Sequence, residues 1–70
     1  MNWKLFREGL ESCMRQFGEI AGHVGAALVH AQAGQYDKAI DKLGDVLAEC
    51  RDVGDELESL IKSLKEALRD

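Results

Sequence analysis

The alternation of apolar and polar residues divides the chain into two long amphipathic segments. In each, apolar residues recur at steps of three and four, the spacing of a helix face that packs in a coiled coil or bundle. The first run is Trp3, Phe6, Leu10, Cys13, Phe17, Ile20, Val24, Ala27 and Ala31. The second run is Ile40, Leu43, Leu47, Cys50, Leu57, Ile61, Leu64 and Leu68. These two runs, the predicted seams, indicate two long helices.

The two runs lose phase with one another at a short stretch around Gly34. The first run predicts an apolar position at residue 38, whereas the second places its own at 36 and 40. We interpret this break as the tip of an antiparallel helical hairpin. The sequence therefore predicts a single all-α domain over residues 1–70, with a helix over 2–33, a turn at 34–35 and a helix over 36–69.

Gly54 interrupts the second seam and leaves the continuity of that helix open. Asp55, with Glu58 three residues later, matches the pattern of a capping box that would start a third short helix. A kink at Gly54 is the other alternative. Because the apolar phase is the same before and after Gly54, we favour one long helix.

Both apolar stripes are wider than a two-stranded coiled coil needs. The first is flanked by Met14, Ala21 and Leu28 and by Gln16, His23 and His30, and the second by Ala39, Val46, Val53, Leu60 and Ala67. Wide stripes are typical of helix bundles. A lone chain of 70 residues also buries only about 60% of its unfolded-state surface. We therefore expect a homodimer in which two hairpins form a four-helix bundle.

Several glycines in the first segment call for an explanation, because each costs about 0.8–1 kcal/mol in a helix interior relative to alanine. Either they break the helix near residue 18 or 25, or they allow another backbone to approach closely. The unbroken spacing of the first seam favours the second interpretation. We define the small-residue face as Gly18, Gly22, Gly25, Ala26 and Val29. It is predicted to point away from the seam and to pack against a second copy or a partner.

His23 and His30 are predicted to lie at the same kind of helix interface. They are seven residues apart, whereas paired metal-binding histidines on a helix stand four apart. We therefore expect no metal and no other cofactor, and leave a pH-sensitive contact open. Cys13 and Cys50 would be offset by about 9 Å in a hairpin folded at Gly34, too far for a disulfide. We expect both to be buried, reduced thiols.

Charge is unevenly distributed around a formal net charge of −4. Acidic residues form a ribbon at Asp37, Asp41, Asp45 and Glu49, and basic residues gather near the chain ends at Lys4, Arg7, Arg15, Lys62, Lys65 and Arg69. The net charge argues against nucleic-acid binding, which remains a minor alternative through the basic end. Charge within the first four residues predicts no signal peptide, and no apolar run reaches the length of a membrane span. We expect a cytoplasmic protein without membrane contact.

From Ala27 to Leu47 the chain resembles part of a tetratricopeptide repeat. Ala27 matches the small residue of the repeat's first helix, Gly34 and Tyr36 match its turn, and Ala39, Ile40, Leu43 and Leu47 match its second helix. The resemblance implies the turn geometry, with Tyr36 as a wedge between the helices. The closing proline of the repeat is missing near Arg51, His30 stands where an aromatic is usual, and there is a single copy. A peptide-binding groove is therefore not implied.

We find no pattern of catalytic residues: the three serines, Ser12, Ser59 and Ser63, have no base predicted beside them, and no phosphate-binding loop is present. We expect neither an enzyme nor a small-molecule substrate. The leading hypothesis is a protein-interaction module that inhibits, adapts or chaperones another protein, of the kind that phages and mobile elements encode. The alternative is a structural subunit that completes a larger bundle through its open end. Trp3, Arg7 and Tyr36 are the predicted partner-binding anchors.

Overall fold

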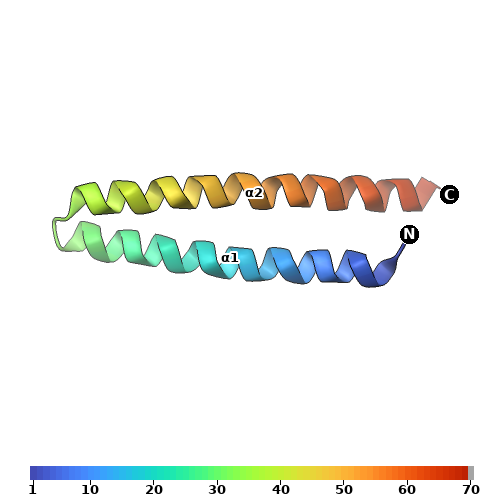
Figure 1. Ribbon diagram of the computed structural model, residues 1–70, viewed down its shortest axis with the longest axis horizontal. Helices are drawn as coiled ribbons and strands as arrows, with labels where there is room; N and C mark the ends of the chain where they lie inside the picture. Colours follow the sequence, from blue (N-terminus) through green and yellow to red (C-terminus); the bar gives the residue numbers. More distant parts are fainter. Residues whose placement is uncertain (70) are drawn as a thin grey trace.

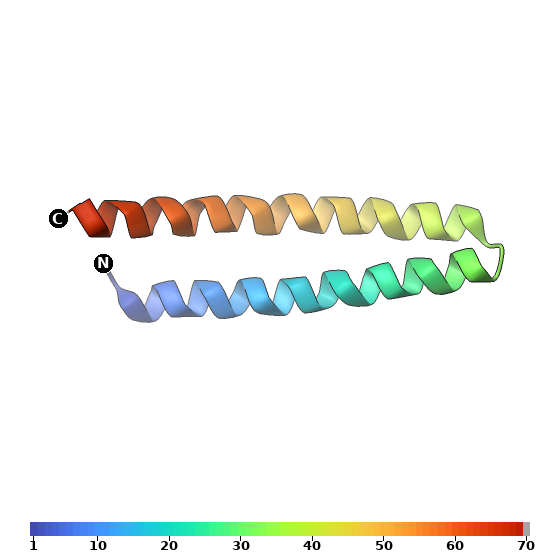
Figure 2. The ribbon, with the colours of Figure 1, turned by 180° about the vertical axis from the view of Figure 1, so that it is seen from behind.

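The computed structural model describes residues 1–69 and shows two long helices joined by one tight turn (Figure 1). Helix α1 spans Trp3–Gln32 and helix α2 spans Tyr36–Arg69. They lie side by side and antiparallel, which both ribbon views show (Figures 1 and 2). The all-α hairpin is therefore confirmed. Helix α2 also runs through Gly54 without interruption, so one long helix forms and the third short helix does not.

Asn2 caps the start of α1. Its side-chain Oδ1 accepts hydrogen bonds from the backbone N–H groups of Lys4 at 3.1 Å and Leu5 at 3.3 Å. These N–H groups lie in the first helical turn and have no partner within the helix, so the cap stabilises this end by about 1 kcal/mol. The helix starts at Trp3, one residue later than predicted, because Asn2 has extended backbone angles.

The turn between the helices is a Schellman motif built on Gly34, whose φ is 74°. The Gln35 N–H donates to the carbonyl of His30 at 2.8 Å, and the Gly34 N–H donates to that of Ala31 at 3.0 Å. A positive φ suits glycine because it has no Cβ. The Gln35 carbonyl then accepts from the Ala39 N–H at 3.1 Å and begins α2. One glycine thus reverses the chain at the predicted tip.

The contact between the helices, which we call the hairpin seam, contains mostly small side chains. Its buried residues are Cys13, Ile20, Ala27, Ala39 and Val53, with Val46, Leu57 and Leu60 partly buried against them. Polar pairs separate the apolar layers: Gln16 Nε2 donates to Glu56 Oε2 at 3.1 Å, and His23 Nδ1 lies 2.5 Å from Glu49 Oε1. The seam therefore alternates apolar and polar layers along its length.

The hairpin seam differs from the predicted seams, and on α2 the prediction was wrong for all but Leu57 and Leu64, which stay partly buried. The residues predicted only to broaden the second stripe, such as Val46 and Val53, make the contact, whereas Leu43 and Leu47 are more than half exposed. On α1 the contact keeps half of the predicted seam and replaces the rest by residues one position earlier. The physical reason is close approach: a Cβ at Gly9 would lie 2.8 Å from Leu60 Cδ2.

The hairpin is a single layer of helices. It measures 55 × 16 × 11 Å with a radius of gyration of 16.1 Å, whereas a compact chain of this length has about 11 Å. Its accessible surface is 5364 Å², and a compact protein of 7.7 kDa exposes about 4,300 Å². The isolated hairpin thus exposes about 1,000 Å² more than its mass requires.

Candidate interaction surface

One broad side of the hairpin carries most of the large apolar side chains. On α1, Leu10, Phe17 and Val24 are between 41% and 48% exposed, and on α2 Leu43 and Leu47 exceed 50%. We define the apolar face as Trp3, Leu10, Met14, Phe17, Val24 and Leu28 from α1, with Tyr36, Ile40, Leu43, Leu47, Cys50, Ile61 and Leu68 from α2. Large side chains lie outside, and small ones fill the seam.

The two helices present this face on the same side because of their antiparallel arrangement. Leu10 directly follows Gly9 of the hairpin seam, and Leu47 directly follows Val46. One residue rotates the side chain by about 100° around a helix. Because the helices run in opposite directions, that rotation leads to the same side of the hairpin on both. The residues of the apolar face therefore directly follow positions of the hairpin seam along each helix.

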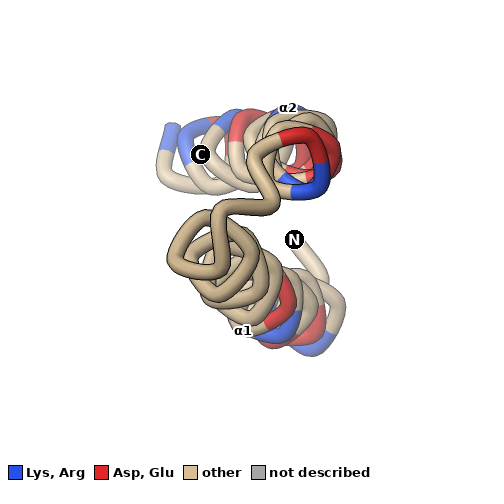
Figure 3. The backbone as a smooth tube through the Cα atoms, turned by 90° about the vertical axis from the view of Figure 1, so that its left-hand side faces the viewer, with Lys and Arg blue, Asp and Glu red and all other residues tan. Residues whose placement is uncertain are grey.

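Charged residues lie away from this face on α1. Seen from the tip, the charged residues of α1 gather along its lower right flank, and its left flank carries none (Figure 3). Residues 20–35, which include the tip half of α1, contain no Asp, Glu, Lys or Arg at all. The apolar face therefore continues along the tip half of α1 without a charged neighbour on that helix.

The three predicted partner-binding anchors have different surroundings. Trp3 is 54% exposed and packs edge-on against Phe6, with ring centroids 5.8 Å apart and planes at 87°. Tyr36 is 66% exposed, so its ring does not wedge between the helices as the resemblance implied. Arg7 is exposed near the start of α1. Trp3 and Tyr36 thus lie at opposite ends of the apolar face.

The small-residue face lies on α1 and has little contact with α2. Among residues 1–69, no atom outside the helix backbone lies within 4 Å of a Cβ built at Gly18, Gly22 or Gly25. Val29 is 63% exposed and Ala26 is half-buried. The predicted orientation away from the hairpin contact is therefore observed.

His23 and His30 make their contacts within the chain. His23 pairs with Glu49 across the hairpin seam, and His30 Nδ1 lies 2.9 Å from the side-chain Oε1 of Gln35 in the turn. From the sequence, Glu49 was assigned only to the acidic ribbon and not to the contact between the helices. A signal for it exists, since polar residues repeat every seven positions on both helices: Gln16, His23 and His30 on α1, and Lys42, Glu49 and Glu56 on α2.

The two cysteines are free, but only one is buried. Cys13 belongs to the core, and its burial raises the pKa of the thiol, which the carboxylate of Glu56 raises further. Cys50 is exposed. The prediction of two buried thiols was therefore wrong for Cys50, which lies one residue beyond Glu49 of the hairpin seam and so belongs to the apolar face.

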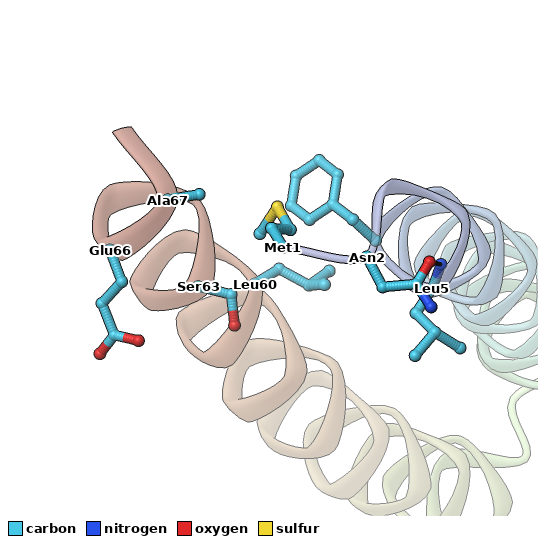
Figure 4. A pocket seen from close by; sticks show the side chains of 8 residues that line it. Met1, Asn2, Leu5, Leu60, Ser63, Glu66 and Ala67 are labelled. Atoms are coloured by element: carbon cyan, nitrogen blue, oxygen red, sulfur yellow. Dashed lines mark hydrogen bonds between the residues drawn. The ribbon is translucent and has the colours of Figure 1, made fainter. Parts of the chain in front are cut away.

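A groove of about 450 Å³ opens between the helices at the end where the termini lie (Figure 4). Its lining consists of Met1, Asn2, Leu5, Phe6, Leu60, Ser63, Glu66 and Ala67. Glu66 supplies a carboxylate, and the Ser63 hydroxyl lies in the same wall. These groups do not form a nucleophile with an oriented base. The groove is shallow, and its lining is mixed polar and apolar.

No protein-family model, curated protein or solved structure matches the chain. In the part of the chain that the structure describes, three or more His, Cys, Asp or Glu residues do not come together where they could hold a metal ion. Neither helix, over residues 1–69, combines the length and apolar character that crossing a membrane requires.

Proposed function

We propose that this chain is a non-catalytic protein-interaction module that acts as a homodimer. Two hairpins pack their apolar faces together and form a four-helix bundle. One observation carries this proposal: the hairpin buries small side chains such as Ala27 and Ala39, and exposes large ones such as Phe17 and Leu43. Burying exposed large apolar side chains is the main favourable term in helix association.

The surface area supports a dimer. The hairpin exposes about 1,000 Å² more than a compact protein of its mass, and a stable interface takes about 800 Å² from each partner. A bundle built from two such layers would also be two helices thick, which gives it a core that a single layer does not have. The excess accessible surface is therefore about as large as the area that each partner buries in one stable interface.

The mass in solution tests the dimer. The wild-type protein should have twice the chain mass of 7.7 kDa in light scattering at micromolar concentration. Phe17→Glu and Leu43→Glu would place a charge in the interface, so each should shift the mass toward one chain. Val29→Glu is the matched control, because Val29 is 63% exposed and lies on the small-residue face. A wild-type monomer, or equal masses for all variants, would refute the dimer.

We further propose that the small-residue face binds another protein, whose activity the dimer inhibits, adapts or chaperones. The face stays outside the bundle, and its glycines would let a partner helix approach closely. Affinity capture from the source cells tests this. Gly22→Leu should lose the captured protein, whereas Gly44→Leu should retain it, because Gly44 is an equally open glycine on α2. Equal capture by both variants would contradict a contact at this face.

The open-end groove favours a second candidate, a structural subunit that completes a larger helical bundle. Leu5 is 62% exposed beside the groove, and Trp3 is 54% exposed near it. This candidate predicts that the isolated chain is largely unfolded and becomes helical when its partner is added. Circular dichroism at 222 nm, with and without partner, separates the two candidates. Full helicity of the isolated protein would count against the second.

A further inference from the structure

We propose that the two hairpins of the dimer lie head to tail, with the tip of each over the open end of the other. This inference rests on the proposed dimer and adds the orientation of its second copy. Two hairpins that meet face to face through a twofold axis have two options. With the tips at the same end, α1 packs on the partner's α2. With the tips at opposite ends, α1 packs on the partner's α1 and α2 on the partner's α2.

The sizes of the side chains on α1 favour the head-to-tail option. The open half of its apolar face carries large residues, namely Trp3, Leu10, Met14 and Phe17. The tip half carries smaller ones on the same side, Ala21, Val24 and Ala31, with Leu28 as the exception. Head-to-tail packing places the large half of one α1 against the small half of the other. Such pairing of large with small fills a core evenly.

The same comparison disfavours tips at the same end. In that arrangement the large half of α1 would face the open half of the partner's α2, whose apolar face carries Ile61 and Leu68. Large side chains would then meet large ones at one end of the bundle and separate the helices there. In the head-to-tail arrangement, Cys50 and Gly54 instead lie close to the middle of α2, where the two α2 helices meet. Small residues at that point allow a close approach.

Charge at the two ends of the hairpin points the same way. The tip end of α2 carries Asp37, Asp41, Asp45 and Glu49 against Lys38 and Lys42. The open end carries Lys4, Arg7, Lys62, Lys65 and Arg69 against Glu8, Glu11 and Glu66, so it is mildly basic. Head-to-tail packing brings each acidic tip beside a basic open end. Tips at the same end would collect the basic residues of both copies together, and such like-charge contacts are unfavourable in an interface.

Distances between spin labels on the two copies test the orientation. The labels are attached to single cysteines, Gln32→Cys at the tip and Asp52→Cys at the middle of α2, in a chain that carries Cys13→Ala and Cys50→Ala. Because Gln16 faces Glu56 and His23 faces Glu49, residue 52 of α2 is level with about residue 20 of α1. In a head-to-tail dimer whose axis passes at that level, the two residues 32 lie about 24 residues apart along the bundle, or about 36 Å at 1.5 Å per residue. Residue 52 lies near the axis, so its two labels should lie within about 30 Å, because neighbouring helices are 8–10 Å apart.

The pair of labels separates the failure of this inference from the failure of the proposed dimer. A long distance at residue 32 with a short one at residue 52 supports the head-to-tail arrangement. Short distances at both positions mean a dimer with its tips at the same end, which overturns the orientation only. No dipolar coupling at either position, together with the mass of one chain, overturns the dimer and the orientation together. Circular dichroism of each labelled chain confirms that it has folded.

Discussion

Replacing glycine by alanine should have opposite effects at two positions of the same hairpin. Gly34 has a φ of 74°, a conformation that costs a residue with a Cβ about 1–2 kcal/mol. Alanine also reduces the entropy of the unfolded chain, which returns about 0.4–1 kcal/mol. The free energy of unfolding of Gly34→Ala should therefore fall by about 1 kcal/mol. The cost is torsional, because among residues 1–69 nothing lies within 4 Å of the added Cβ.

At Gly22 the same change should stabilise the protein. Gly22 lies in the interior of α1, where alanine is favoured over glycine by about 0.8–1 kcal/mol, and the surrounding space is open. The two variants should therefore differ by about 2 kcal/mol in urea unfolding followed at 222 nm. Protein concentration must be equal in all samples, because the stability of a dimer depends on it. If Gly34→Ala and Gly22→Ala were equally stable, the positive φ of Gly34 could not be the reason for an opposite effect at the two positions.

Three further predictions concern the hairpin seam. Gly9→Ala should stabilise the protein by less than Gly22→Ala, because the added Cβ would lie 2.8 Å from Leu60 Cδ2. In a Leu60→Ala background the stabilisation by Gly9→Ala should rise to about 0.8–1 kcal/mol. Urea unfolding of the single and double variants measures both values. Glu49→Ala should lower the free energy of unfolding by no more than about 1 kcal/mol, since the His23 and Glu49 side chains are 40% and 29% exposed. Glu49→Gln should restore part of this loss if the pair acts as a hydrogen bond. Glu58→Ala, at an exposed position of α2, is the control and should change the free energy of unfolding little. The free energy of unfolding should decline as the pH rises above the ordinary pKa of a cysteine thiol. Burial raises the pKa of Cys13 in the folded state, so the unfolded chain loses this proton first. Cys13→Ala should remove that decline, which unfolding experiments across the alkaline range measure.

The helices, the tip and the continuity of α2 could be predicted from the sequence because they depend on local patterns. Steps of three and four specify a helix, and the loss of phase locates Gly34 at the turn. The cap by Asn2 is a local feature as well, since its side-chain acceptor directly precedes the helix. Each of these features is decided by residues close together in the chain.

The choice of face inside the hairpin could not be predicted in the same way. Gly9 and Leu10 are neighbours, and both begin stripes with helical spacing, so periodicity accepts either. The structure selects the stripe of smaller residues, and at Gly9 the absence of a side chain leaves room for Leu60. Ranking positions by hydrophobicity therefore placed the largest side chains between the two helices, whereas most of them lie on the exposed apolar face. The polar residues at intervals of seven, His23 and Glu49 among them, were the better indicator of the seam.

The same choice explains why the exposure of single residues was misjudged. Cys50 follows Glu49 by one residue and therefore turns outward with the apolar face. Tyr36 starts α2, is 66% exposed and also belongs to the apolar face, while backbone hydrogen bonds close the turn. Both outcomes depend on the rotation of each helix about its axis, which tertiary packing sets.

The polar pairs within the hairpin seam have a consequence for alignment. Small apolar side chains make similar contacts if one helix slides past the other by a turn, so they discriminate poorly between such registers. The carboxylates of Glu49 and Glu56 meet His23 and Gln16 in the observed register, and a slide of one turn would separate both pairs. A partly buried carboxylate without a partner is costly. We therefore expect these polar pairs to fix the register of the two helices. The same register sets which residues of α1 and α2 lie side by side on the apolar face.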